Sequence, residues 1–544
     1  MPTITLNRKV LEAAIGKKLA EDQLKERISM LGTDLESVTK DEIIVEIFPN
    51  RPDLLSDSGF ARTFKSFLGA ETGLKEYKIT KSKHKLIIDP SVKDVRPWSA
   101  CAIVTGLKLD DEKIRELIQI QEKLHITFGR NRKKVAIGIY PLESIQMPIT
   151  FKALAPQQIK FHALEGKGVQ SAAEILETHP AGKAYGHLLE GKARYPVFVD
   201  AKGSILSMPP VINSHDTGKV TEKTKEVFIE CSGFDYSAQA KCLNMIVTAL
   251  ADMGGSIHAM EIEAYGKKLV SPDLRPEEMP ITIAYVNKIL GLALKESDLK
   301  PLLERMGYGY EKGKAKIPAY RADILHPIDL VEDIAIAYGF ENFTEELPAV
   351  ATIGKEQGIS ILKRKISEIL AGLGFLECAT LHLTSKETQN EKMLAKEHLI
   401  PLLNAVNQEY NVLPAWAVPA LMDIFHRNRQ HEYPQHLFTF LTTFAKGQSE
   451  TGITEVQKLV VGIADEKADY TKAKQVLDYL LRMLGKDCAI EKAAHPSFIP
   501  GRVAKILIGN KDAGLIGELH PKVLENWQLI MPVSVFEIDV NLLL

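Results

Sequence analysis

The sequence lacks the features that mark secreted, zinc-binding or membrane proteins. Its five cysteines are scattered, odd in number and form no CxxC pair, so neither a disulfide framework nor a zinc site is expected. No apolar run approaches the roughly 18 residues that cross a bilayer. The N-terminus has charges inside its only apolar stretch, unlike a signal peptide. We therefore expect a cytoplasmic chain without membrane contact.

An excess of one charge is also missing. The formal net charge is −2, with 45% hydrophobic and 25% charged residues, which is ordinary for a soluble protein. Any contact with nucleic acid must therefore come from a local patch or from a partner. The sequence has no Gly-rich phosphate loop and no GxSxG, the motifs of P-loop enzymes and α/β-hydrolases.

Length is the first positive feature. A chain of 544 residues is too long for one hydrophobic core, and its periodicities predict an α+β multidomain protein. Residues 1–80 alternate helix and strand, and residues 86–268 form a mixed α/β domain. Residues 272–345 show two helices, a hairpin and a third helix, typical of a winged-helix-like module. Residues 355–544 predict an antiparallel sheet flanked by helices.

Two segments stand apart from these regular elements. The Lys-rich stretch at residues 75–85 is predicted to be a linker. Residues 209–221 are predicted to be an irregular loop, because the pair Pro209-Pro210 and several short polar residues disfavour regular structure.

A cluster of acids suggests a metal site. Asp329, Glu332 and Asp333 stand at i, i+3 and i+4, on one face at the start of a predicted helix, and Asp323 precedes them. Seven carboxylates and one arginine lie between Arg321 and Glu346. Such crowding favours a cation with hard oxygen ligands such as Mg²⁺. The alternative is that acids at a helix N-terminus complement its dipole.

Polar groups gather in a second place, the loop at residues 209–224. Asn213, Ser214 and Thr217 bring short hydrogen-bonding side chains together there; the alternative is an ordinary surface loop. A basic cluster of Arg130, Arg132, Lys133 and Lys134 precedes a predicted strand at residues 135–139. It could meet phosphate or simply be a solvated strand entrance.

Five blocks in order resemble the β subunit of phenylalanyl-tRNA synthetase. The blocks are Glu46–Ser56, Gln121–Gly138, Pro209–Thr224, Pro318–Asp333 and Gly517–Pro521, and together they span almost the whole chain. The length, and the absence of an oligonucleotide-binding barrel after the first domain, resemble the archaeal and eukaryotic form.

The resemblance implies a subunit of a ligase that attaches phenylalanine to its tRNA with ATP. It implies an α subunit that binds ATP and phenylalanine, an α2β2 heterotetramer, and Mg²⁺ held by Asp323, Asp329, Glu332 and Asp333. It also implies that the domain at residues 86–268 hydrolyses tyrosine wrongly attached to tRNA, with Asn213, Ser207 and Thr217 as candidate site residues.

The last domain departs from the family pattern at residues 402–405, 413–416 and 438–441, and it lacks the arginines that clamp ATP in class II synthetases. The expectation is a C-terminal domain that resembles an inactive class II core. A free-standing hydrolase of mischarged tRNA and a non-enzymatic RNA-binding scaffold remain as alternatives.

Overall fold

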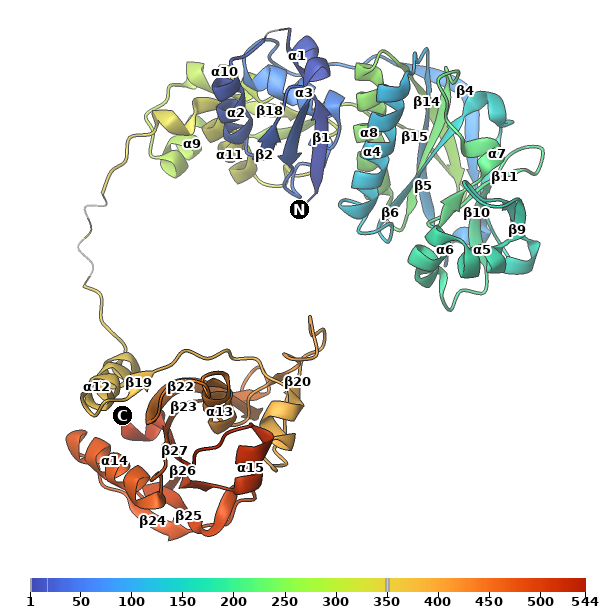
Figure 1. Ribbon diagram of the computed structural model, residues 1–544. Helices are drawn as coiled ribbons and strands as arrows, with labels where there is room; N and C mark the ends of the chain where they lie inside the picture. The colour runs from blue at the N-terminus through green and yellow to red at the C-terminus, as the bar shows by residue number, and fades with distance from the viewer. Residues whose placement is uncertain (1, 17, 348–349, 351–352) are drawn as a thin grey trace. The chain divides into compact units, whose positions relative to one another are not determined.

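The computed structural model describes residues 2–16, 18–347, 350 and 353–544. The chain forms two compact units, Met1–Glu346 and Leu347–Leu544, which are drawn in Figure 1. Among the helices of the described residues, none combines the length and the apolar character needed to cross a membrane.

The first part of unit 1 is a small α+β layer. Its three-stranded antiparallel sheet has the order β1-β3-β2. The Ser56 hydroxyl caps α3 by accepting from the Gly59 amide at 3.0 Å, and Gly69 follows the helix with a φ of 75°. The elements are β1 (Thr3–Asn7), α1 (Arg8–Ile15), α2 (Glu21–Met30), β2 (Asp34–Val38), β3 (Glu42–Glu46) and α3 (Asp57–Phe67).

A ten-stranded mixed sheet forms the largest part of unit 1. Its path is β12-β11-β10-β7-β4-β14-β5-β13-β6, and β15 pairs with β14. The strands are β4 (Ile79–Ile88), β5 (Trp98–Thr105), β6 (Val135–Pro141), β7 (Ile149–Leu154), β10 (Tyr195–Val199), β11 (Ile205–Met208), β12 (Ile212–Asn213), β13 (Val227–Gly233), β14 (Ser256–Ala264) and β15 (Lys267–Ser271). A separate two-stranded pair is β8 (Lys160–His162) and β9 (Val169–Ser171).

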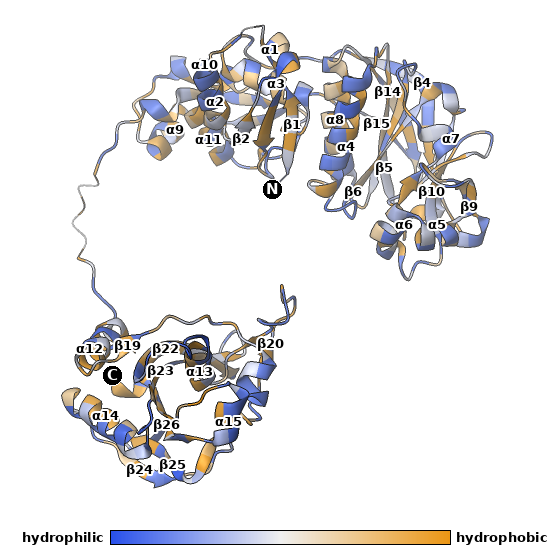
Figure 2. Cartoon of the chain, viewed as in Figure 1, coloured by the Kyte–Doolittle hydropathy of each residue, from blue (hydrophilic) through white to orange (hydrophobic). Residues whose placement is uncertain are grey.

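Helices cover this sheet on one face and build a lobe beyond it. Helices α4 and α8 pack on β5, β6 and β13, and Figure 2 shows polar and apolar residues on both helices. The helices are α4 (Asp111–Ile126), α5 (Ala172–Thr178), α6 (Pro180–Tyr185), α7 (His215–Gly218) and α8 (Tyr236–Asp252). The buried residues of the sheet's other face and of the lobe form two further apolar clusters.

The prediction of a linker at residues 75–85 is wrong from Ile79 onward, where strand β4 begins. Strand β4 lies parallel to both β14 and β7 in the middle of the sheet. Leu86 and Ile88 are buried, whereas Lys85 reaches out to Glu263 at 2.9 Å. The lysines raised the mean polarity of a segment that still forms a strand and buries Leu86 and Ile88 at its end, because alternation rather than mean polarity decides strand formation.

The last part of unit 1 matches the predicted helix, hairpin and helix order. It contains a further strand that sequence reasoning missed, β16, which makes the hairpin a three-stranded sheet of order β16-β18-β17. Gly313 turns the hairpin with a φ of 76°, which favours glycine. The elements are β16 (Glu277–Pro280), α9 (Ile283–Leu290), α10 (Glu296–Arg305), β17 (Gly309–Glu311), β18 (Lys314–Ile317) and α11 (Pro327–Tyr338).

Unit 2 is a seven-stranded sheet of order β19-β22-β23-β27-β26-β25-β24. All of its pairs are antiparallel except β19 with β22. The strands are β19 (Leu376–Glu377), β22 (Gln435–Lys446), β23 (Ile453–Ala464), β24 (Ala489–Lys492), β25 (Phe498–Ile508), β26 (Lys511–Leu519) and β27 (Val533–Asp539). A small pair, β20 (Ile400–Pro401) with β21 (Val412–Leu413), stands apart.

Helices cover both faces of this sheet. One apolar cluster joins the sheet to α12 (Gly358–Gly372) and α14 (Tyr470–Met483). The other joins it to α13 (Val418–Arg427) and α15 (Pro521–Asn526), with Trp527 fully buried. The predicted antiparallel sheet with flanking helices is therefore confirmed, with one parallel pair at its edge.

Candidate functional site

The loop at residues 209–221 is more regular than predicted. After Pro209-Pro210, strand β12 pairs antiparallel with β11, which places Asn213 opposite Ser207. The one-turn helix α7 follows, because the Gly218 amide donates to the Ser214 carbonyl at 2.9 Å. Turning back on β11 satisfies backbone groups that an irregular loop would leave to solvent. The structure thus brings two of the three predicted editing residues together.

Tyr140 and Glu230 complete the cluster. From strand β6, the Tyr140 hydroxyl oxygen lies 2.8 Å from Ser207 Oγ, 3.3 Å from Glu230 Oε1 and 3.5 Å from Asn213 Oδ1. Sequence reasoning missed both residues. A lone carboxylate within the apolar strand Val227–Gly233 was the signal available, since a buried charge needs a reason.

Burial sets the electrostatics of this cluster. It raises the pKa of Glu230 to about 8, against the lowering effect of the Arg96 charge and of hydrogen bonds from Tyr140 and Ser232. Gly138 lies beside the pair, and a Cβ added there would stand 2.1 Å from the Tyr140 hydroxyl and 2.6 Å from Glu230 Oε1. Glycine at this position makes room for the two polar groups.

Glu230→Gln should change how stability depends on pH. The folded carboxyl keeps its proton up to a pH of about 8, whereas the unfolded one loses it near its ordinary value of 4.5. Between these values the folded state binds the extra proton, so the free energy of unfolding falls as pH rises, by up to about 1.4 kcal/mol per pH unit. The glutamine variant should lack this slope and exceed the wild type in stability above pH 8.

Urea unfolding measured from pH 5 to pH 9 tests this expectation. Glu263→Gln is the control, because Glu263 forms a partly exposed surface pair with Lys85. Parallel stability curves for Glu230→Gln and wild type would show that Glu230 is charged in the folded chain.

Thr217 lies on α7, which contacts β6 and β11. Its side chain is buried, and its Oγ1 atom has no hydrogen-bond partner among the described residues. The neighbouring Gly218 packs close to Asn213, since a Cβ at Gly218 would lie 3.1 Å from Asn213 Cβ. All three predicted editing residues therefore belong to one small region, and Thr217 retains an unused hydroxyl.

The four predicted metal ligands lie at the start of α11, but three of them already accept hydrogen bonds. Arg321 donates to both oxygens of Asp323, at 2.8 and 2.7 Å, and lies 2.8 Å from Asp333. Asp329 caps the helix by accepting from the Leu325 and His326 amides at 2.8 and 2.7 Å.

Glu332 is the exposed member of this group. The protein still removes part of the water around its carboxyl, and this partial desolvation, and after it the charges of Asp333 and Asp329, raise its pKa. Among the described residues, Asp34, Glu36 and Glu46, elsewhere in unit 1, are the acids whose ligand atoms all lie within 4.8 Å of one another. Arg321 is the one arginine among the seven acids of this stretch. Without any partner, it already neutralises part of the acidic cluster. The metal assignment stays a prediction.

The basic cluster divides into two pairs. Arg130 and Lys133 are exposed, whereas Arg132 and Lys134 fold back on the protein. The Lys134 ammonium lies 4.6 Å from the centre of the Phe128 ring. Only Arg130 and Lys133 are thus freely available to an external phosphate.

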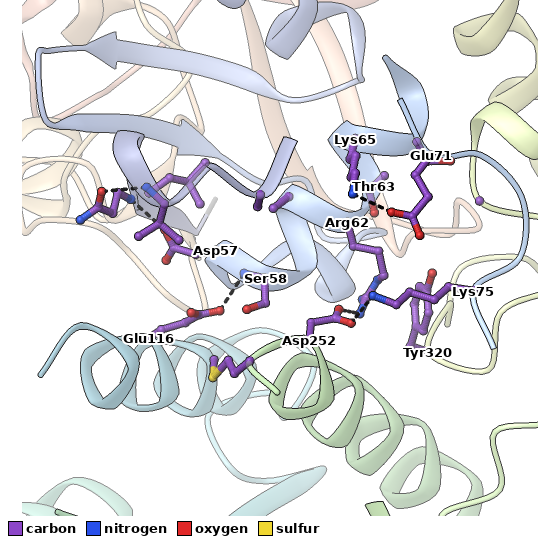
Figure 3. Close-up of a pocket in the computed structure, with 18 of the residues that line it drawn as sticks. Asp57, Ser58, Arg62, Thr63, Lys65, Glu71, Lys75, Glu116, Asp252 and Tyr320 are labelled. Atoms are coloured by element: carbon purple, nitrogen blue, oxygen red, sulfur yellow. Dashed lines mark hydrogen bonds and ion pairs between the residues drawn. The ribbon is translucent and has the colours of Figure 1, made fainter. Parts of the chain in front are cut away.

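A cavity of about 810 Å³ lies where the three parts of unit 1 meet. Figure 3 shows its charged lining. Arg62 and Lys75 both pair with Asp252, at 2.6 and 2.8 Å, and the Ser58 amide donates to Glu116 at 2.7 Å. Burial, and after it the charge of Asp57, raise the pKa of Glu116 to about 7. These contacts tie α3 to α4 and α8, so the cavity is a polar junction.

Three family models match the chain in order. They are the B3/4 domain at residues 107–249, the tRNA synthetase B5 domain at residues 279–340, and the phenylalanyl tRNA synthetase beta chain CLM domain at residues 344–540. The mixed sheet, the helix–hairpin–helix part and unit 2 correspond to these three matches. This order of modules defines the class of the chain as an aminoacyl-tRNA synthetase component.

Full-length relatives give the particular family. Phenylalanine--tRNA ligase beta subunits from Thermococcus sibiricus and Pyrococcus horikoshii are 40% and 39% identical, covering 99% of this chain and 98% and 99% of theirs. An N-terminal fragment of the Pyrococcus horikoshii phenylalanyl-tRNA synthetase β-subunit matches in structure with a TM-score of 0.59 and 39% identity, over 62% of this chain and 99% of that one. The chain belongs to the family of phenylalanine--tRNA ligase β subunits. The resemblance seen in the five blocks is confirmed.

Proposed function

We propose that this chain supports the ATP-dependent attachment of phenylalanine to its tRNA by a separate α subunit and removes tyrosine attached by mistake. The observation that carries the proposal is 40% identity over 99% of the chain to a ligase β subunit. The partners are an α subunit, in an α2β2 heterotetramer, and the tRNA for phenylalanine. ATP and phenylalanine bind mainly to the α subunit.

The proposed division of labour follows the chain. Residues 1–80 are an N-terminal α+β domain, and residues 86–268 are the editing domain. Residues 272–345 form a winged-helix-like module that holds the metal ion. Residues 355–544 form a mostly antiparallel sheet flanked by helices, and we propose that they are a class II synthetase core without the arginines that bind ATP. Activation of phenylalanine then falls to the α subunit.

Editing is assigned to Asn213, Ser207 and Thr217. An apolar pocket that accepts phenylalanine cannot strongly reject tyrosine, which only adds a hydroxyl, so a second site must bind that hydroxyl. The Asn213 amide can both donate to and accept from a phenol. Ser207 is ordered by Tyr140, and the Thr217 hydroxyl is unused, so both suit the ester end and its attacking water.

Mg²⁺ is assigned to Asp323, Asp329, Glu332 and Asp333. These hard oxygen ligands fit the ion, and Glu332 is an exposed carboxylate beside three others. Because Arg321 and the helix cap already use part of this set, a surface from the α subunit would complete the site. The ion would neutralise the remaining acids at that contact.

The double variant Asp329→Asn with Glu332→Gln tests both the metal site and the assembly. Wild type should form a complex with the α subunit that weakens when EDTA removes Mg²⁺. The variant keeps side-chain size and the cap acceptor but loses two charges, so its affinity should fall by about 10-fold or more and should no longer respond to EDTA. Sedimentation of the mixed subunits measures this.

Glu345→Gln with Glu346→Gln is the control, because it removes two exposed charges nearby. The metal assignment fails if the Asp329/Glu332 variant assembles as tightly as the control and remains sensitive to EDTA. The proposed function itself fails if the wild-type chain does not associate with the α subunit at all.

A further inference from the structure

Arg132 makes contacts that separate it from its basic neighbours. Its Nη1 atom donates to the Val211 carbonyl at 2.8 Å and lies 3.5 Å from the Pro210 carbonyl. Its Nη2 atom donates to Glu122 at 3.1 Å. The guanidinium lies 4.1 Å from the centre of the Tyr185 ring. Only 13% of the side chain is exposed, so the positive charge of Arg132 interacts with groups of the protein itself.

These bonds hold the chain directly before the editing residues. Strand β12 has just two residues, Ile212 and Asn213, paired with β11. Such a short edge strand is weakly fixed by its own ladder. Because Val211 is the residue before β12, the bond from Arg132 holds the start of this strand, while the Leu164 amide holds its end by donating to the Asn213 carbonyl at 2.9 Å. The position of the Asn213 amide therefore depends in part on Arg132.

The backbone that carries Arg132 is itself tightly constrained. Arg130, Asn131 and Arg132 all have left-handed φ angles, of 51°, 51° and 64°. Arg132 N donates to the His125 carbonyl at 3.0 Å, and its own carbonyl accepts from Arg96 at 3.3 Å. Left-handed φ angles at three successive non-glycine residues cost free energy, and such a backbone persists only where the surrounding contacts fix it. The guanidinium is thus held by a constrained turn between α4 and β6.

We infer that Arg132 is a positioning residue for the editing reaction: it clamps the Val211 carbonyl and thereby fixes the Asn213 amide beside Ser207 and Tyr140. This inference rests on the proposed editing function. It also assigns Arg132 to the protein interior rather than to a tRNA phosphate. The substrate that depends on the clamp is the tyrosyl ester of tRNA, because only that reaction uses the Asn213 amide.

Hydrolysis of preformed tyrosyl-tRNA by the assembled enzyme tests the clamp. Arg132→Ala should lower kcat by about 10- to 100-fold, the loss expected from a charge-assisted hydrogen bond, with little change in KM for the tRNA. Arg132→Lys should recover part of the rate, since an ammonium can reach one carbonyl but not reproduce the planar fork. Phenylalanine charging should be unchanged in both variants and reports on folding.

Two comparisons separate positioning from other roles. Lys133→Ala removes an adjacent exposed charge and should leave kcat unchanged. In an Asn213→Ala background, Arg132→Ala should cost little more, because both changes disable the same amide. A raised KM that depends on salt, with kcat intact, would identify Arg132 as a phosphate contact and overturn the inference.

Amide hydrogen exchange gives a measurement that is independent of editing. Arg132→Ala should speed exchange in residues 211–217 and leave α4 and β6 protected. Unchanged exchange in residues 211–217 would contradict the inference that Arg132 holds this segment, even if editing is lost. If the wild-type complex does not hydrolyse tyrosyl-tRNA while exchange does respond, the proposed editing function has failed and the role of Arg132 in it falls too, although the contact is real.

Discussion

Arg321→Ala is expected to lower the free energy of unfolding of unit 1 by about 3–5 kcal/mol, the cost of removing one partner from a buried ion pair. Arg321 is 2% exposed and is shared between Asp323 and Asp333. Its loss leaves Asp323 and Asp333 without the cation that they share, and Asp333 is buried. Urea unfolding in EDTA measures the change without help from a bound metal ion.

Arg275→Ala is a closely matched control. Arg275 makes the same forked contact to an aspartate two residues away, but on a side chain that is 86% exposed. Water screens an exposed pair, so its removal should leave stability almost unchanged. Equal losses in the two variants would mean that Arg321 does not hold the acids of α11 together.

Asn213→Ala is expected to slow the hydrolysis of tyrosyl-tRNA by about 5- to 150-fold and to leave phenylalanine charging nearly unchanged. The physical reason is the loss of one hydrogen bond to the tyrosine hydroxyl, worth about 1–3 kcal/mol when its partner is left unsatisfied. Preformed tyrosyl-tRNA incubated with wild-type and variant complexes gives the rates directly.

Asn407→Ala serves as the comparison, since Asn407 is an exposed asparagine in unit 2. Deacylation at the same rate by wild type and Asn213→Ala would remove Asn213 from the site. No deacylation by the wild type would mean that this chain does not edit.

Much of the fold could be predicted because local rules and tertiary packing agree. The helix at residues 57–67 has a serine cap, a glycine just after its end and buried phenylalanines, so local signals and packing agree there. Strand β4 was missed because its lysines raised the mean polarity of a segment in which lysines alternate with other residues. Strand β16 is too short and too polar for periodicity to reveal, and it forms because β18 offers a free edge.

Only the part of the candidate site that is formed by residues close together in the sequence could be predicted. Asn213 and Ser207 are six residues apart and meet through one tight turn. Tyr140 and Glu230 come from strands far along the chain, and no local pattern places them together. Arg132 looked like one cation in an exposed group, because its bond joins the segment between α4 and β6 to Val211, which is 79 residues away in the sequence. Contacts between distant segments are set by topology.

The most direct test of the central claim is phenylalanine-dependent pyrophosphate exchange with the purified chain, with and without an α subunit. Because we propose that the last domain has no ATP-binding arginines, the chain alone should exchange at background, and the mixture should exchange and charge tRNA. Exchange by the chain alone would contradict the assignment. A mixture as inactive as the α subunit alone would instead favour a free-standing hydrolase or an RNA-binding scaffold.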